Sequence, residues 1–241
     1  MTDMENPIVL VHGWGGSFET TWRRSGFADL LEDAGRVVIG VDLLGHGSAP
    51  KPHDPEAYLD LTQRVLEAAP NSPCDFVGFS LGAMTLLRLA VDHPDRVRSL
   101  VLAGIGRNVL ETSDTTSHRM IIDALRAEQP GMGSLDDGER GPASNVARMF
   151  VQYADGPGND RLALTAVLEC GRPAFTPDEL ARVTCPALVV IGSDDFAGPA
   201  DPLVQLLPNA RLVTLPRVDH FATPENFGFF DAALDFLGAA L

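Results

Sequence analysis

Six short stretches of the chain are almost continuously apolar, each four to seven residues long. Runs of this kind are typical of parallel strands covered on both faces, because both sides of the pleat then need apolar side chains. Glycine-rich or polar residues follow most of them, which indicates loops at the strand ends. The predicted strands are Ile8–Val11, Val37–Val41, Cys74–Val77, Arg98–Gly104, Pro186–Gly192 and Arg211–Leu215.

Apolar residues recur at helical spacing between these strands. Pro94 ends the helix that follows the third strand, because proline disfavours helix at and before its own position. Strands that alternate with helices pair in parallel, so the pattern predicts an α/β fold: a mostly parallel central sheet of about six strands with helices on both faces. The predicted helices are Thr21–Ala34, Pro55–Ala69, Ala83–Val91 and Pro224–Leu241.

The alternation stops between the fourth and fifth strands, where residues 105–183 show helical patterns and no evident strand. We interpret this segment as a helical cap or lid inserted into a core formed by residues 1–104 and 184–241. Met120, Met149 and Phe150 of the insertion, with Phe221 of the core, are candidates to bind substrate. Packing against the sheet is the commoner role for any one of these apolar side chains. The predicted helices here are Ser117–Glu128, Ala143–Ala154, Arg161–Cys170 and Pro177–Val183.

The third strand leads directly into Gly78-Phe79-Ser80-Leu81-Gly82, which fits the pattern G-x-S-x-G. A serine on a sharp turn from strand to helix has strained backbone geometry, and side chains at the two glycine positions would collide with neighbouring elements. The turn places Ser80 at the N-terminus of a helix, whose amides favour an adjacent anion. Ser80 is therefore a candidate nucleophile. The alternative is an ordinary turn flanked by glycines, in which the serine has no catalytic role.

A serine hydroxyl needs a base, and a histidine base needs a carboxylate to orient it. Of the six histidines, His220 alone follows a late strand with a carboxylate available after the preceding strand. His12 and His46 are rivals, because their loops also lie at the carboxyl ends of strands, where ligands bind in such sheets. The order serine, aspartate, histidine is that of the triad in α/β-hydrolases.

The residues alone leave the acid open. Asp194 and Asp195 are adjacent after the fifth strand and should point in different directions. Asp219 neighbours His220 in sequence, and neighbours in an extended loop tend to face apart. Asp42 follows the second strand, whereas the loop after the fourth strand, Ile105–Asn108, contains no carboxylate.

Composition and charge limit the classes of function that the chain can have. The formal net charge is −15 and the pI is about 4.6, which argues against nucleic acid and anionic membranes as partners. The 45% hydrophobic content suffices for a sizeable core. Cys74, Cys170 and Cys185 are odd in number and show no C-x-x-C spacing, so we expect reduced thiols. The N-terminus is polar and acidic, and no apolar run approaches membrane-spanning length. These features favour a cytoplasmic enzyme with a small-molecule substrate.

Six motifs along the chain together have a specific pattern: His12-Gly13-Trp14, Asp42-x-x-Gly45-His46-Gly47, Gly78–Gly82, His93–Val97, Gly192–Asp195 and His220-Phe221. Through them the chain resembles, over nearly its whole length, the α/β-hydrolase superfamily. The resemblance selects Asp195 as the acid, because the family's acid usually lies three residues after the glycine of a G-x-x-D motif. It also implies an oxyanion hole formed by the backbone amides of Leu81 and Trp14.

The sequence departs from the family in two respects. Only seven residues precede the first strand, so the N-terminal hairpin typical of the family should be absent. In the family's strand order, Val37–Val41 is then an exposed edge, and we expect a helix, a loop or a second protomer to shield it. The cap is also short, which suggests an accessible pocket.

These observations predict a serine hydrolase that cleaves a small ester or lactone without a metal or organic cofactor. A histidine base predicts activity that rises with pH between 5 and 8. Haloalkane dehalogenases and epoxide hydrolases resemble the family but use an aspartate nucleophile, which Ser80 argues against. Carbon–carbon bond hydrolases, cofactor-free perhydrolases and lyases on the same triad remain alternatives, as does a non-catalytic ligand-binding receptor of the same fold.

Overall fold

The computed structural model describes residues 7–112, 116–127 and 142–239. Its six strands form one sheet with the order β2-β1-β3-β4-β5-β6, and every pair is parallel. All six predicted strands are present, within two residues of the expected ends, and the α/β fold class is confirmed. The strands are β1 (Ile8–Val11), β2 (Val38–Val41), β3 (Cys74–Phe79), β4 (Val97–Ala103), β5 (Ala187–Gly192) and β6 (Ala210–Leu215).

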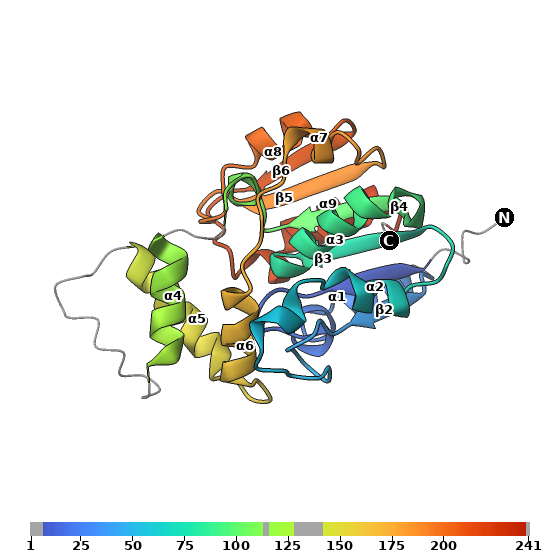
Figure 1. Ribbon diagram of the computed structural model, residues 1–241. Coiled ribbons are helices and arrows are strands. Elements are labelled where there is room, and N and C mark those ends of the chain that lie inside the picture. The colour runs from blue at the N-terminus through green and yellow to red at the C-terminus, as the bar shows by residue number, and fades with distance from the viewer. Residues whose placement is uncertain (1–6, 113–115, 128–141, 240–241) are drawn as a thin grey trace.

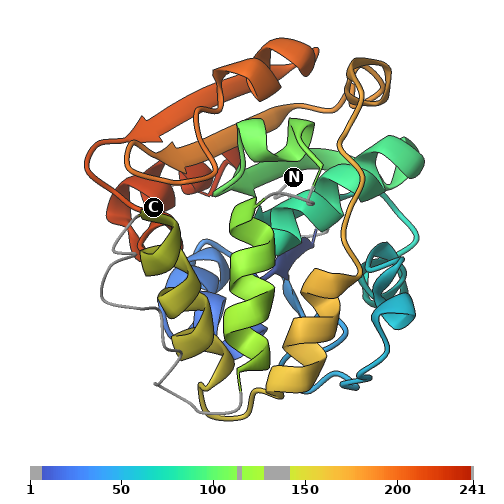
Figure 2. The same cartoon turned by 60° about the vertical axis from the view of Figure 1, so that its left-hand side comes forward.

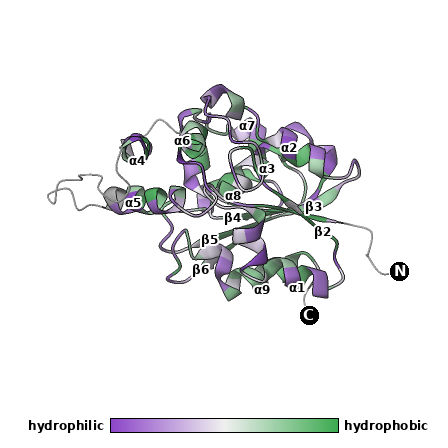
Figure 3. Ribbon diagram, turned by 90° about the horizontal axis from the view of Figure 1, so that it is seen from below, coloured by the Kyte–Doolittle hydropathy of each residue, from purple (hydrophilic) through white to green (hydrophobic). Residues whose placement is uncertain are grey.

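Helices cover both faces of this sheet (Figures 1 and 3). Successive residues of a strand point to opposite faces, so β1 contributes to two separate cores. Val9 and Val11 pack in the cluster beneath α2, α3 and α8, whereas Ile8 and Leu10 pack in the cluster beneath α1 and α9. The helices are α1 (Phe27–Asp33), α2 (Thr62–Ala68), α3 (Leu81–Asp92), α8 (Asp201–Leu206) and α9 (Phe227–Phe236).

Three predicted helices are shorter than expected. The first, Thr21–Ala34, is split into a π-helical turn at Glu19–Arg23 and α1. Gly26, with φ of 83°, separates the two, because this backbone conformation cannot continue a right-handed helix. In the second, Pro55–Ala69, the side chain of Asp60 accepts hydrogen bonds from Thr62 N (2.9 Å) and Thr62 Oγ1 (2.6 Å) and starts α2 anew.

The C-terminal helix also begins later than predicted. A 3-10 turn at Thr223–Glu225 precedes it, and the side chain of Asn226 accepts a hydrogen bond from Gly228 N at 2.9 Å, capping α9. The helix ends at Phe236, before Gly238 with φ of 64°. The predicted end at Leu241 lies outside the described residues.

Three helices project from the carboxyl-terminal side of the sheet (Figures 1 and 2). They are α4 (Thr116–Arg126), α5 (Pro142–Ala154) and α6 (Arg161–Glu169), and α4 packs against both others. They have an apolar cluster of their own, built around Ile121, Leu125, Leu164 and Leu168. This helical group is the part of the fold that corresponds to the expected cap.

The fourth helix of the insertion, α7 (Pro177–Leu180), packs with the sheet instead. Thr176 and Glu179 form a capping box at its start, and Arg88 of α3 donates a hydrogen bond to Glu179 Oε1 at 2.8 Å. Phe175, Leu180 and Val183 belong to the same cluster as α3. The limits of the cap at residues 105 and 183 stay a prediction. In the described part of the chain, no helix is long and apolar enough to span a membrane.

Candidate active site

Ser80 lies between β3 and α3 in a backbone conformation that L-residues seldom adopt, with φ of 50° and ψ of −112°. The flanking glycines make this turn possible. A Cβ atom added at Gly78 would lie 2.7 Å from Ala83 N, and one at Gly82 would lie 2.4 Å from Val11 O. Any larger residue at either position would push β1 or α3 away from β3.

The Ser80 hydroxyl begins a chain of hydrogen bonds. Its Oγ lies 2.9 Å from Nε2 of His220, and Nδ1 of His220 lies 2.9 and 3.0 Å from the two carboxylate oxygens of Asp195. A carboxylate can only accept, so the proton is on Nδ1, and Nε2 is free to accept from the serine hydroxyl. His220 and Asp195 are both buried.

Two backbone hydrogen bonds bring the loops that carry the acid and the histidine together. Ser193 N donates to Leu215 O at 2.8 Å, and Asp194 N donates to Val218 O at 3.0 Å. A Cβ atom at Gly192 would lie 1.9 Å from Val218 O, so this approach requires glycine. The hydrogen bond from Ala197 N to Asp195 Oδ1, at 2.8 Å, then fixes the carboxylate.

The other candidate acids have different partners. Asp194 Oδ1 accepts from the hydroxyl of its neighbour Ser193 at 3.0 Å. Asp219 accepts from Ala222 N at 2.9 Å. Asp42 accepts from Phe18 N and from Ser48, which ties the loop after β2 to the loop after β1. Among the described residues, Asp195 is the carboxylate that contacts His220.

The rival histidines bond to backbone groups. His12 Nε2 accepts from Leu43 N at 3.1 Å, so its Nδ1 donates to Gly13 O at 2.7 Å. His46 Nδ1 donates to Leu44 O at 2.9 Å. Burial lowers the pKa of His12, and it lowers the pKa of His46 to about 3. Both rings are therefore neutral and hold loops in place.

The two backbone amides predicted for the oxyanion hole, those of Leu81 and Trp14, belong to segments next to Ser80. Leu81 is the first residue of α3, so its N–H has no acceptor within the helix. Trp14 lies in a turn closed by a hydrogen bond from Gly16 N to Gly13 O at 3.1 Å. A Cβ atom at Gly13 would lie 3.3 Å from Ser80 Cβ, so this turn runs directly beside the serine.

Aromatic rings surround His220. Phe196 lies 4.3 Å and Phe221 5.4 Å from the His220 ring, between centroids. Phe221 stacks on Tyr153 at 5.0 Å, and Trp14 lies 4.8 Å from Phe150. Phe150 and Phe221 are predicted from the sequence, whereas Phe196 and Tyr153 are not. Their positions were readable, since Phe196 directly follows Asp195 and Tyr153 lies one helical turn after Phe150.

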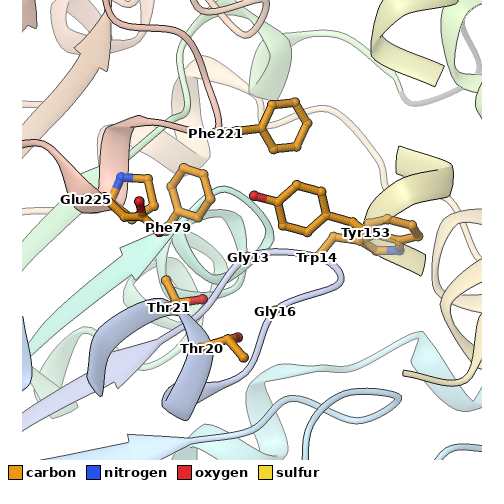
Figure 4. Close-up of a pocket in the computed structure, with 10 residues that line it drawn as sticks. Gly13, Trp14, Gly16, Thr20, Thr21, Phe79, Tyr153, Phe221 and Glu225 are labelled. Atoms are coloured by element: carbon orange, nitrogen blue, oxygen red, sulfur yellow. The ribbon is translucent and has the colours of Figure 1, made fainter. Parts of the chain in front are cut away.

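A pocket of about 70 Å³ opens between the rings of Tyr153 and Phe221 and the turn Gly13–Gly16, here called the glycine turn (Figure 4). Of the predicted substrate-binding residues, Phe221 belongs to the pocket lining. Met120, Met149 and Phe150 lie half-buried on α4 and α5 and do not belong to it. The lining residues are Gly13, Trp14, Gly16, Thr20, Thr21, Phe79, Tyr153, Phe221, Pro224 and Glu225. In the described residues, no group of three or more histidine, cysteine or acidic side chains is placed to hold a metal ion.

The fold and this site are those of a hydrolase built on a parallel α/β sheet. A family model described as "alpha/beta hydrolase fold" matches residues 6–146. Because this is more than half of the chain, the chain belongs to the α/β-hydrolase family.

Curated relatives in the family are enzymes. The chain is 29% identical to a pimeloyl-[acyl-carrier protein] methyl ester esterase of Neisseria meningitidis, over 91% of this chain and 88% of that protein. It is 26% identical to a 2-hydroxy-6-oxo-2,4-heptadienoate hydrolase of Pseudomonas putida, over 97% and 90% of the two chains. A solved hydrolase structure from Pseudomonas aeruginosa matches the fold with a TM-score of 0.68 at 24% identity, covering 97% of this chain and 91% of that one.

Proposed function

We propose that the chain is a serine hydrolase that cleaves small carboxylic esters or lactones through an acyl-enzyme intermediate. The observation that carries this proposal is the continuous hydrogen-bonded chain from Ser80 through His220 to Asp195. Its geometry suits proton transfer from a nucleophile to a base whose tautomer is fixed by a carboxylate. The family membership and the esterase among the relatives support the same reaction class.

In the proposed mechanism, Ser80 Oγ attacks the ester carbonyl carbon while Nε2 of His220 takes the hydroxyl proton. Asp195 stabilises the imidazolium that forms. The amides of Trp14 and Leu81 donate to the oxyanion, and each such donor contributes roughly 3 kcal/mol to stabilising the transition state. His220 then protonates the departing alcohol. Water attacks the acyl-enzyme with His220 again as base, and Ser80 is released.

The walls of the site favour an uncharged, fairly apolar acyl or alcohol group. Phe196 and Phe221 lie next to His220, and Trp14 and Phe150 extend the aromatic surface toward α5. The net charge of −15 disfavours anionic substrates in solution. A methyl ester with an apolar acyl chain fits these properties, and the name of the Neisseria relative specifies a methyl ester.

The test is hydrolysis of p-nitrophenyl esters from acetate to octanoate by the wild-type chain, Ser80→Ala and Ser25→Ala. We expect turnover by the wild type and by Ser25→Ala, and its loss in Ser80→Ala. Labelling of Ser80 by a fluorophosphonate without turnover of any ester would mean that the triad is active on another substrate. A wild type that shows neither reaction would contradict the proposal and favour a non-catalytic receptor.

Carbon–carbon bond hydrolysis is the second candidate, because two relatives matched over more than nine-tenths of this chain bear names of that kind. The discriminating assay follows the loss of absorbance of a conjugated 2-hydroxy-6-oxo-dienoate. Turnover of the dienoate with p-nitrophenyl esters left intact would replace the ester proposal. Turnover of the p-nitrophenyl esters with the dienoate left intact would retain the ester proposal.

Three further assignments belong to this proposal. The group α4, α5 and α6 acts as a short cap over the site, and Met120 and Met149 contribute to its substrate-facing side. The enzyme works in the cytoplasm, in agreement with three free cysteines. Two copies associate through the β2 edge of the sheet.

A further inference from the structure

The glycine turn Gly13–Gly16, beside Ser80, is hydrogen-bonded to the helical group of α4, α5 and α6 that projects from the sheet. Asn159, in the connection between α5 and α6, donates from Nδ2 to Gly15 O at 2.8 Å. The same nitrogen donates to Tyr153 O, near the end of α5, also at 2.8 Å. Asn159 thus joins the turn to α5 through one side-chain amide.

Two more contacts hold the turn from the same direction. The indole Nε1 of Trp14 donates to Leu164 O of α6 at 3.0 Å, and the Trp14 ring packs on Phe150. Tyr153 lies over Gly15, since a Cβ atom added at Gly15 would be 3.2 Å from Tyr153 Cβ. The turn is therefore fixed by α5, α6 and their connection.

The turn needs such external support because of its composition. Gly15 has φ of 72°, and Gly16 follows it directly. Glycine peptides rotate more freely than any others, so two in succession define the backbone poorly. The Gly15 carbonyl lies two peptide groups after the Trp14 N–H, so a rotation of the backbone at Gly15 reaches the Trp14 amide through one intervening peptide group and directs that amide away from the oxyanion position.

We infer that Asn159 is a positioning residue for ester hydrolysis, acting through Gly15 on the Trp14 amide. This inference rests on the proposed function, because the Trp14 amide matters only if an oxyanion forms beside Ser80. Asn159 contacts none of the triad residues and is not itself part of the pocket lining, and its bond to the lining residue Tyr153 is made to the backbone carbonyl. Substituting Asn159 should therefore lower kcat, which depends on stabilisation of the transition state, and change KM little.

The direct test replaces Asn159 by alanine and by aspartate. Aspartate has the same shape but cannot donate to the two carbonyl groups. Complete loss of one oxyanion donor lowers kcat by about 100-fold to 1,000-fold. Because the turn keeps its Trp14 and Tyr153 contacts, we expect a loss of kcat of about 10-fold in both variants, with KM for a p-nitrophenyl ester changed less than about twofold.

The matched control is Asp160→Ala. Asp160 is the next residue, and its carboxylate caps α6 and pairs with His53 without contacting the turn. We expect Asp160→Ala to lower the melting temperature and leave kcat within about twofold. If it lowers kcat as much as Asn159→Ala does at a temperature where circular dichroism shows both folded, the effect is general loosening of the cap, and the inference is wrong.

A transition-state analogue supplies the readout that a purely structural role would not change. A trifluoromethyl ketone forms a tetrahedral adduct with the serine, and the oxyanion of this adduct is stabilised by the oxyanion hole. The parent methyl ketone without fluorine binds mainly without forming the adduct. We expect the Asn159 variants to weaken inhibition by the trifluoromethyl ketone by the factor they lose in kcat/KM, with the parent ketone unchanged. Equal weakening of both inhibitors, or of neither, would overturn the inference.

Failure of the proposed function looks different. If the wild-type chain neither turns over esters nor reacts with a fluorophosphonate, the function and this inference both fall. If the wild type is active and both Asn159 variants match it in kcat and inhibition, the inference alone falls.

Discussion

Two adjacent aspartates after β5 have separate environments. Asp195 is buried and contacts His220 at 2.9 Å, whereas Asp194 is exposed and pairs with Ser193. The residue pattern alone left both open because it does not give the direction of a side chain in a loop. The two backbone hydrogen bonds that Ser193 N and Asp194 N donate to the segment carrying His220 set these directions in the fold.

Substituting each aspartate by asparagine tests the assignment. Asn cannot accept strongly from Nδ1 of His220, so Asp195→Asn should lower kcat by about 10,000-fold, as for an asparagine in a catalytic triad. Asp194→Asn is the control and should stay within about threefold. Steady-state kinetics on one p-nitrophenyl ester measures both. Comparable losses would mean that Asp195 is not the triad acid.

The buried His46 makes stability depend on pH. In the unfolded chain a histidine binds a proton below about pH 6.5, whereas burial lowers the pKa of folded His46 to about 3. Between these values the unfolded state binds more protons, so stability falls as pH falls. The slope contributed by His46 is about 1.4 kcal/mol per pH unit at most.

The comparison that isolates this contribution is urea unfolding of the wild type and His46→Gln at pH 7, 6, 5 and 4. Glutamine offers a donor for Leu44 O but does not titrate. We expect the free energy of unfolding of His46→Gln to fall less steeply toward acid than that of the wild type. Parallel curves would show that His46 takes up its proton as readily when folded.

At the residue scale, the sequence indicated which polar side chains lie together better than it indicated the walls of the site. Ser80 and His220, which the structure brings into contact, could be selected because the proposed chemistry requires particular residue types after particular strands. Phe196 and Tyr153 carry no such requirement, and an aromatic residue in a loop or on a helix is as compatible with packing as with a substrate surface. Phe196 contacts His220 from the loop after β5, and Tyr153 contacts Phe221 from α5, so both contacts depend on the tertiary arrangement.

At the element scale, strands were predictable because continuous apolar runs leave few alternatives. The ends of the helices were less predictable from the sequence. The break at Gly26 and the new start at Asp60 depend on local conformations that compete with an otherwise suitable helical pattern. The separate position of α7 was unpredictable for another reason: its contacts to Arg88 of α3 join residues distant in sequence.

Gly82 connects two elements, and its replacement tests that connection. An alanine Cβ would lie 2.4 Å from Val11 O and 2.5 Å from His12 O, so β1 and the loop after it must move. We expect Gly82→Ala to destabilise the fold by about 1–3 kcal/mol, the usual cost of overpacking, and to lower kcat by displacing the Trp14 turn. Thermal unfolding and p-nitrophenyl ester kinetics measure the two effects.

The control for Gly82 is Gly238→Ala. Gly238 has φ of 64° and open space around it, so alanine there costs only backbone strain, about 1–2 kcal/mol. Its kcat should equal that of the wild type. A Gly82→Ala variant with normal kcat would show that β1 absorbs the methyl group without moving the turn.

At the scale of the whole molecule, a buried ionic cluster joins distant segments at the end of the sheet away from Ser80. Asp75 of β3 pairs with Arg36 at 2.6 Å and also bonds Arg98 and Ser99 of β4. Arg36 donates in turn to Leu237 O after α9 at 2.8 Å. The cluster thus connects β3, β4, the start of β2 and the C-terminal segment.

Asp75→Asn should be strongly destabilising and catalytically neutral. Removing one partner of a buried ion pair costs about 3–5 kcal/mol, because the remaining charge is uncompensated. The exposed pair of Asp29 with Arg23 is the control, and Asp29→Asn should cost less than about 1 kcal/mol. Urea unfolding gives the free energies, and kcat of the folded variant at 25 °C should match the wild type. A stability loss below about 1 kcal/mol would contradict this role.

The sheet has two edges, and they differ in character. β6 carries the charged Arg211, and all of its residues except Leu215 are exposed or half-buried. β2 is short and apolar, and Val37, directly before it, is 53% exposed. Charged side chains discourage strands of two molecules from pairing, and apolar edges without them invite it. The β2 edge is therefore where we expect a second copy of the chain.

Light scattering after gel filtration tests this association on the wild type and on Val37→Lys. A lysine at the edge hinders strand pairing without entering the core, so we expect a dimer for the wild type and a monomer for the variant. Each copy carries a net charge of −15, and salt screens the repulsion between charges that are farther apart than a Debye length, about 10 Å at 0.1 M. The wild-type dimer should therefore strengthen from 0.05 to 0.5 M salt. A clean monomer at micromolar concentration throughout this range would mean that β2 is a tolerated free edge, and that its short length alone protects it.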